Sequence, residues 1–273
     1  MGRTVNVDVN ALNDFARGAF TSPSGRRHDV LRLGTGPAVI VIHEVPGITS
    51  LVAAFARRVA ERGMTAVLPD LFGTPGREPT NGYMVTSMAR ACVSREFTVL
   101  ATNRTSPVVG YLRALAAHEH LECGGPGVGA VGMCLTGGFA LAMSVDRVVV
   151  APVLSQPSLP LPISTGRRRE LGLSDSDLTA VKGRLDEGLC VMGLRFSGDT
   201  KSPAERFTRL RQELGDNFID VEIDSAEGNP WGYQKGAHSV LTGDYSDAPG
   251  SPTRQALEDV LAFLASRLGV TPP

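Results

Sequence analysis

The chain has 273 residues, enough for one large α/β domain or two small ones. Hydrophobic residues make up 42% and charged residues 20% of the sequence, a composition typical of a soluble globular protein. The formal net charge of −1 gives no field of one sign, so the sequence predicts neither a nucleic-acid partner nor attraction to an anionic membrane. No apolar run approaches the roughly 20 residues that a membrane span needs, and the first residues lack the apolar core of a signal peptide. We therefore expect a cytoplasmic protein with no membrane partner.

Strand-like and helix-like segments alternate along the chain. A continuous apolar run at residues 38–43 is typical of a strand buried on both faces of a parallel sheet. Apolar residues at helical spacing follow over 51–62, and Gly63 stands where a glycine commonly ends a helix. The other predicted strands are 65–69, 128–131, 147–151, 190–196 and 218–223, and the other predicted helices are 106–118, 203–214 and 253–268, with a short helix ending near residue 143. This alternation predicts one α/β domain over residues 1–273, a mostly parallel sheet with helices on both faces.

Two stretches do not fit a minimal sheet of this kind. Residues 73–81 form a loop rich in glycine and proline, and residues 155–188 form a long insertion with a helix expected from about residue 176 to 187. Long excursions near strand ends often cover a binding site. The insertion could therefore act as a lid, and a surface decoration is the alternative interpretation.

The most informative stretch is Gly132-Met133-Cys134-Leu135-Thr136-Gly137-Gly138, which stands between a predicted strand and a predicted helix. A nucleophile on a sharp turn from strand to helix is held in a strained, accessible position and needs small neighbours. The helix that begins there would point its N-terminus at the sulfur, which favours thiolate over thiol. We therefore interpret Cys134 as a nucleophile on such a turn.

The other cysteines give no sign of a metal or redox site. Cys92, Cys123 and Cys190 form no CxxC pair, so we expect small apolar residues of the interior. The glycines of residues 127–132 match G-x-G-x-x-G, but they fall before and inside a predicted strand, whereas a dinucleotide site needs them between a strand and a helix. The sequence therefore predicts no metal and no organic cofactor.

A nucleophilic cysteine needs a base, and the base needs an acid that orients it. In sheets of this type both partners follow the nucleophile in the chain, and the acid comes first. Of the five histidines only His238 lies after Cys134, in a loop beyond the last predicted strand. Asp199 lies between them, where a predicted strand ends and a turn begins. The residue order therefore indicates a triad of Cys134, Asp199 and His238.

At this point the sequence resembles the dienelactone hydrolase family of the α/β-hydrolase fold. The resemblance covers about residues 25 to 268 and rests on His43-Glu44-Val45-Pro46-Gly47, on Pro69-Asp70-Leu71-Phe72, on the Gly-x-Cys turn, and on Gly198-Asp199 with His238-Ser239. It implies an α/β-hydrolase fold and an enzyme that hydrolyses esters or lactones.

The resemblance also implies roles for residues that surround the nucleophile. Glu44 would hold the resting thiol and act as the local base that activates Cys134, and a carboxylate beside a thiol could take its proton in a desolvated site. The oxyanion hole would be formed by the backbone N–H groups of Leu135 and Val45, the former at a helix N-terminus.

The sequence departs from the family's pattern at two positions. The family usually reads Gly-x-Cys-x-Gly-Gly, but here Thr136 precedes the glycine pair. Family members that hydrolyse dienelactone have an arginine four residues after the histidine, where this chain has Thr242. The basic run at residues 167–169 could contact an anion or form a solvated face. The reaction type therefore transfers from the resemblance better than the substrate does.

Together these features predict a hydrolase of small-molecule esters or lactones, similar to carboxymethylenebutenolidase and active as a monomer or homodimer. One alternative is a broad carboxylesterase or thioesterase for neutral substrates, which Thr242 motivates. Another is a binding module of the same fold without turnover, which Thr136 and the insertion motivate.

Overall fold

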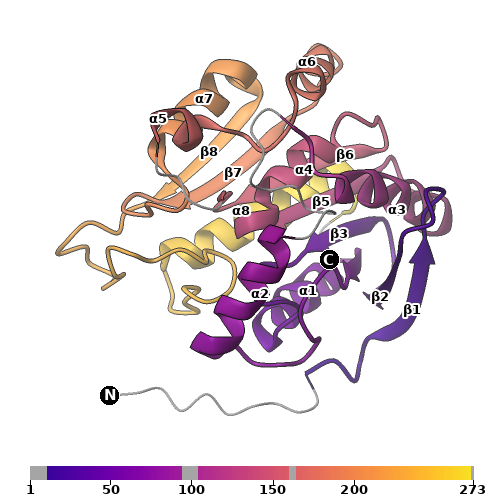
Figure 1. The fold of residues 1–273 in the computed structure, drawn as a ribbon, viewed down its shortest axis with the longest axis horizontal. Helices are drawn as coiled ribbons and strands as arrows, with labels where there is room; N and C mark the ends of the chain where they lie inside the picture. The colour runs from indigo at the N-terminus through magenta and orange to yellow at the C-terminus, as the bar shows by residue number, and fades with distance from the viewer. Residues whose placement is uncertain (1–10, 94–103, 160–163, 272–273) are drawn as a thin grey trace.

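The computed structural model describes residues 11–93, 104–159 and 164–271. Within these residues one eight-stranded sheet has the order β1-β2-β4-β3-β5-β6-β7-β8 (Figure 1). The strands are β1 Ala16–Thr21, β2 Arg27–Leu33, β3 Ala38–Ile42, β4 Thr65–Pro69, β5 Val128–Met133, β6 Val149–Ser155, β7 Val191–Phe196 and β8 Phe218–Ile223. Pairing is antiparallel from β1 to β2 and from β2 to β4, and parallel in the rest of the sheet. The predicted α/β fold with a mostly parallel sheet is confirmed.

Helices cover both faces of this sheet (Figure 1). They are α1 Ser50–Glu61, α2 Asn81–Val93, α3 Val108–Cys123, α4 Gly137–Met143, α5 Thr165–Arg169, α6 Asp175–Gly183, α7 Ala204–Leu214 and α8 Pro252–Leu268. In β3, Val39 and Val41 pack into the core under α1 and α8, while Ile40 and Ile42 pack into the core under α3 and α4. This alternation explains the continuous apolar run, because both sides of the strand are buried. None of the helices in the described ranges has the length and apolar character needed to cross a bilayer.

The structure corrects several sequence-based boundaries and adds elements that were not expected. The helix expected at 106–118 continues to Cys123, the strand expected at 147–151 spans Val149–Ser155, and the helix expected at 176–187 ends at Gly183. The strands β1 and β2 and the helices α2 and α5 were not predicted. β1 is an edge strand with almost every side chain exposed, so it has no apolar alternation to detect.

The insertion at residues 155–188 is joined to α7 by a buried arginine. Arg206 of α7 is 1% exposed, and its guanidinium donates hydrogen bonds to the carbonyls of Pro157 and Glu170, each at 2.6 Å. The same guanidinium reaches the carbonyl of Lys201 at 3.3 Å, beside the loop that carries Asp199. A buried cation needs such acceptors, so this contact set joins the insertion to the acid loop. The role of the insertion as a lid stays a prediction.

Close backbone packing requires the glycines that flank Cys134. A Cβ on Gly132 would lie 2.4 Å from the Thr136 carbonyl oxygen, and one on Gly137 would lie 2.6 Å from the Cα of Pro157. Both contacts are with backbone atoms, which cannot move aside as a side chain can. The turn after β5 can therefore be this tight only without side chains at these positions.

We expect Gly132→Ala to lower the free energy of unfolding by about 2 kcal/mol or more, because the added methyl group overpacks the turn. The matched control is Gly110→Ala on the exposed side of α3, where a Cβ meets nothing within 4 Å. That substitution should raise stability by about 0.5–1 kcal/mol through helix propensity. Urea unfolding of both variants tests this, and equal stabilities would contradict the packing argument.

Candidate active site

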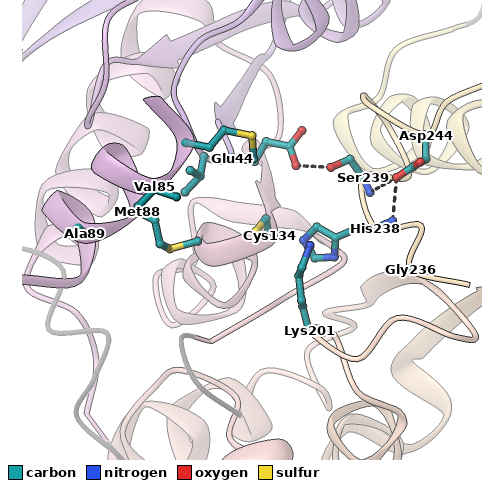
Figure 2. A pocket seen from close by; sticks show the side chains of 12 residues that line it. Glu44, Val85, Met88, Ala89, Cys134, Lys201, Gly236, His238, Ser239 and Asp244 are labelled. Carbon is teal, nitrogen blue, oxygen red and sulfur yellow. Dashed lines mark hydrogen bonds between the residues drawn. The ribbon is translucent and has the colours of Figure 1, made fainter. Parts of the chain in front are cut away.

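Cys134 begins the 3-10 turn Cys134–Thr136 between β5 and α4, with a φ of 54°. Among the described residues only Gln156 shares such a positive φ without being glycine. Backbone strain of this kind costs of order 1–3 kcal/mol and is concentrated at functional sites. The Cys134 side chain is 7% exposed, and it lines a cavity (Figure 2).

Thr136 fixes this turn to the neighbouring strand. Its hydroxyl donates to the Ile42 carbonyl at 2.8 Å, and its oxygen accepts from the Met133 N–H at 3.0 Å. The end of β3 and the end of β5 are therefore joined through one buried side chain. The departure from the family's pattern at this position thus adds hydrogen bonds at the turn.

His238 and Asp199 are brought together from two separate loops. The Nδ1 of His238 lies 2.6 Å from an oxygen of the Asp199 carboxylate, whose other oxygen accepts from the Lys201 N–H at 2.9 Å. The backbone of His238 is held in turn by Asp244, which accepts from its N–H at 2.8 Å. The Nε2 of His238 is buried and has no hydrogen-bond partner in the described part of the chain. Figure 2 shows this ring beside the Cys134 side chain.

The charges around His238 control its proton. Burial lowers its pKa, but the sulfur of Cys134 and the carboxylate of Asp199 outweigh burial and raise the pKa to about 10. Burial likewise raises the pKa of Asp199, but the bond to His238 keeps this pKa below its usual value. The pKa of His238 is higher in the folded protein than its usual value of 6.5. The protonated imidazole therefore stabilises the fold fully below pH 6.5, and this stabilisation is lost as the pH rises towards 10.

Glu44 lies in the loop after β3 and lines the same cavity as Cys134. One carboxylate oxygen accepts from the Ser239 hydroxyl at 2.8 Å and from the Gln156 amide at 3.2 Å, and the other accepts from the Thr242 hydroxyl. Figure 2 shows the carboxylate directed towards Ser239. Neutral donors thus satisfy this buried carboxylate, and none of the hydrogen bonds of the described residues joins it to Cys134.

The two backbone groups expected to form the oxyanion hole come from the loop after β3 and from the turn after β5. Val45 lines the cavity, and its N–H donates to no acceptor among the described residues. Leu135 follows Cys134 directly in the 3-10 turn before α4. An N–H at the start of a helical segment is oriented towards developing negative charge.

The cavity encloses about 640 Å³ and has two unlike walls (Figure 2). The apolar wall is one side of α2, formed by Met84, Val85, Met88 and Ala89. The polar wall has the residues Glu44, Cys134, Lys201, His238, Ser239 and Asp244. Lys201 is the lysine among these lining residues, and no arginine is among them. Elsewhere, Arg168 pairs with Glu205 and Arg169 donates to Gln212, so two members of the basic run contact α7.

Sequence reasoning did not find several residues of this site. Ser158, whose hydroxyl lies 3.2 Å from the Cys134 sulfur, and Gln156, which bonds Glu44, follow β6 without any motif. The apolar wall of α2 was not found because the helix itself was not predicted. Of the other cysteines, Cys123 and Cys190 are half-buried against the core, less enclosed than expected, and the side chain of Cys92 lies outside the described set.

We expect Cys134→Ala to lower the pKa of His238 below about 10, because the negative charge of the sulfur is removed while burial remains. Histidine ring signals in an NMR pH titration would measure the shift. His43 serves as an internal control, because its pKa of about 4 is set mainly by burial and not by Cys134. A His238 pKa that stays the same in the variant would contradict the charge coupling.

The sequence profile of the dienelactone hydrolase family matches residues 30–267. No curated protein gives a significant match. Among solved structures, a candidate dienelactone hydrolase from Klebsiella pneumoniae is 18% identical, with 92% of this chain and 98% of that chain covered and a TM-score of 0.60. A cold-adapted esterase from an Arctic intertidal metagenomic library is 13% identical, with 92% of each chain covered and a TM-score of 0.54.

A puromycin-hydrolyzing peptidase from Mycobacterium tuberculosis is also similar, at 16% identity and a TM-score of 0.61. The match covers 100% of this chain and 42% of the peptidase chain. At these identities the solved structures show a shared fold. The family profile spans most of the sequence, and the residues it spans include the strained turn, the aspartate and the histidine. The chain therefore belongs to the dienelactone hydrolase family and is an ester-hydrolysing enzyme with the α/β-hydrolase fold.

Proposed function

We propose that this enzyme hydrolyses small esters or lactones through a cysteine nucleophile, with Cys134, His238 and Asp199 as the triad. The observation that carries the proposal is the position of Cys134 on a strained turn beside an imidazole whose far nitrogen is held by Asp199 at 2.6 Å. A nucleophile, a base and an orienting acid in this order form the arrangement that acyl transfer needs.

The reaction would proceed in two halves. The thiolate of Cys134 attacks the acyl carbon, and the N–H groups of Leu135 and Val45 stabilise the oxyanion. The intermediate collapses to a thioester as His238 gives its proton to the leaving alcohol. His238 then takes a proton from water, which attacks the thioester carbon, and the acid leaves as the thiolate is restored.

The charge coupling at His238 suits this exchange of roles. While the sulfur is negatively charged, it favours the imidazolium, which is the acid that the first half requires. In the thioester the sulfur carries no charge, so one cause of the raised pKa disappears. His238 then becomes a better base at the moment when water must be deprotonated.

We propose Glu44 as the local base that first takes the proton from Cys134, as the family resemblance implies. Two observations support this role: the carboxylate lines the same cavity, and its partners are neutral hydroxyl and amide groups. No ion pair involving Glu44 occurs among the described residues, so no fixed cation competes for its charge. To reach the sulfur, the carboxylate would exchange one of these neutral partners.

The second candidate is a carboxylesterase or thioesterase for neutral substrates. Thr242, which stands in place of the family's arginine, donates its hydroxyl to Glu44 and offers no cation to a substrate carboxylate. The α2 wall of the cavity is apolar, which favours an acyl chain over a charged group. These observations favour neutral, apolar esters over an anionic lactone.

Cys134→Ala should reduce kcat/KM by at least about a thousandfold on short acyl esters and on an unsaturated lactone, because the nucleophile is lost. Mass spectrometry of the unaltered enzyme with an activated ester should show an adduct at Cys134 that forms and then disappears. Unchanged turnover in the variant would reject the cysteine mechanism, and a permanent adduct without turnover would support the binding module.

For a series of esters with the same leaving group, we expect kcat/KM to rise by up to about fourfold for each methylene added to the acyl chain. The reason is that each buried methylene contributes about 0.8 kcal/mol. Met84→Ser should flatten this dependence by shortening the apolar wall. The control is Thr86→Ser, an exposed α2 position that does not line the cavity. A strong preference for anionic lactones would eliminate the neutral-substrate interpretation.

A further inference from the structure

Ser158 is the residue whose side chain bonds the sulfur of the proposed nucleophile. It lies in the loop after β6, is 7% exposed, and its hydroxyl oxygen is 3.2 Å from the Cys134 sulfur. Its backbone N–H donates to the Cys134 carbonyl at 2.8 Å, so the two residues are joined twice. The preceding carbonyl, of Pro157, accepts from the buried guanidinium of Arg206. This loop is therefore held at both its backbone and its side chain.

The hydrogen-bond partners around the sulfur determine which group donates. The Ser158 hydroxyl has no other partner among the described residues. While the sulfur is a thiol, either group can donate this bond, and once the sulfur is a thiolate the hydroxyl is the donor. The Nε2 of His238 is also buried without a hydrogen-bond partner there. Glu44, the other candidate partner of the thiol, is bonded to Ser239, Thr242 and Gln156 instead. Ser158 is thus the side chain bonded to this sulfur among the described residues, and the imidazole that lines the same cavity has its Nε2 unoccupied. A hydroxyl that can donate suits a thiolate, which can only accept.

We propose that Ser158 is a further catalytic residue, whose hydroxyl donates a hydrogen bond to the Cys134 thiolate both once the thiol has lost its proton and as the thiolate leaves the acyl carbon. The inference rests on the proposed cysteine mechanism. The sulfur is negatively charged before attack and again when the second tetrahedral intermediate collapses. A fixed donor at this distance stabilises the negative charge at both points. It has little effect on the thioester that forms between them, because the thioester sulfur is uncharged.

Other ionisable groups lie in the same cavity as this sulfur, and a test must separate them from Ser158. His238, Glu44, Lys201 and Asp244 line the same cavity, and Asp199 lies behind the imidazole. Replacing the Ser158 hydroxyl changes none of these charges. A change in the ionisation of Cys134 in such a variant therefore reports on the hydrogen bond itself.

The experiment is alkylation of Cys134 by iodoacetamide as a function of pH, measured on the Cys134 peptide by mass spectrometry. Ser158→Ala should raise the midpoint of the alkylation profile by about 1 to 2 pH units, so that 10- to 100-fold less thiolate reacts below both midpoints. Ser158→Thr, which keeps the hydroxyl, should restore the original profile. Ser144→Ala is the matched control, because the hydroxyl of this buried serine, at the far end of α4, donates to the Leu141 carbonyl and not to the sulfur.

An unchanged or lowered midpoint in folded Ser158→Ala would overturn the proposal, since a lowered midpoint means that the thiol donates to the serine. If the alanine variant does not fold, Ser158→Thr against Ser158→Val supplies a comparison of equal bulk in which only the hydroxyl differs. Alkylation needs no ester substrate. A wild-type enzyme that hydrolyses no ester would therefore overturn the proposed function, while a midpoint shift would still be measurable.

Discussion

The strained turn at Cys134 is the constraint on which the rest of the site depends. A side chain at a φ of 54° is unfavourable, and the neighbouring structure has to hold it there. Thr136 does so by bonding the ends of β3 and β5, and glycines at 132 and 137 let the backbone of adjacent segments approach. The sulfur is consequently fixed at the C-terminal ends of the central parallel strands. The loops after β3, β6 and β7 meet at this edge, as crevices in open α/β sheets do.

The electrostatics of the site follow from that placement. Burial alone would keep His238 neutral, yet the sulfur and Asp199 raise its pKa to about 10. The protonation of the imidazole therefore depends on whether the sulfur carries charge, which changes during an acyl-transfer cycle. Glu44 shows the opposite arrangement, a buried carboxylate satisfied by neutral donors. The threonine in place of the family's arginine is part of that arrangement, so one substitution affects both the carboxylate and the substrates that the cavity suits.

The cavity lies between a segment held by buried hydrogen bonds and a helix with exposed apolar side chains. The insertion after β6 is tied to α7 through Arg206, and the same residue reaches the loop that carries Asp199. The opposite wall comes from α2, whose residues Met84 and Val85 are 41% and 69% exposed. Apolar side chains left exposed beside a polar catalytic wall are consistent with recognition of an apolar group. The apolar wall proposed to select substrates is thus separate from the polar wall that holds the candidate triad.

The sequence by itself determined the fold class and the identity of the candidate triad. Continuous apolar runs such as residues 38–43 report burial on both faces, and a cysteine among small residues between a strand and a helix reports a sharp turn, so both are local signals. Asp199 and His238 were identifiable because their order along the chain follows from the topology of such sheets. Only the tertiary structure decided the partners of these residues. Ser158, Gln156 and Thr242 have no local signature, because their roles come from contacts between loops far apart in the chain. The edge strand β1 and the helix α2 were missed for a related reason: their side chains face solvent or a cavity, so the periodicity that a packed core imposes is absent.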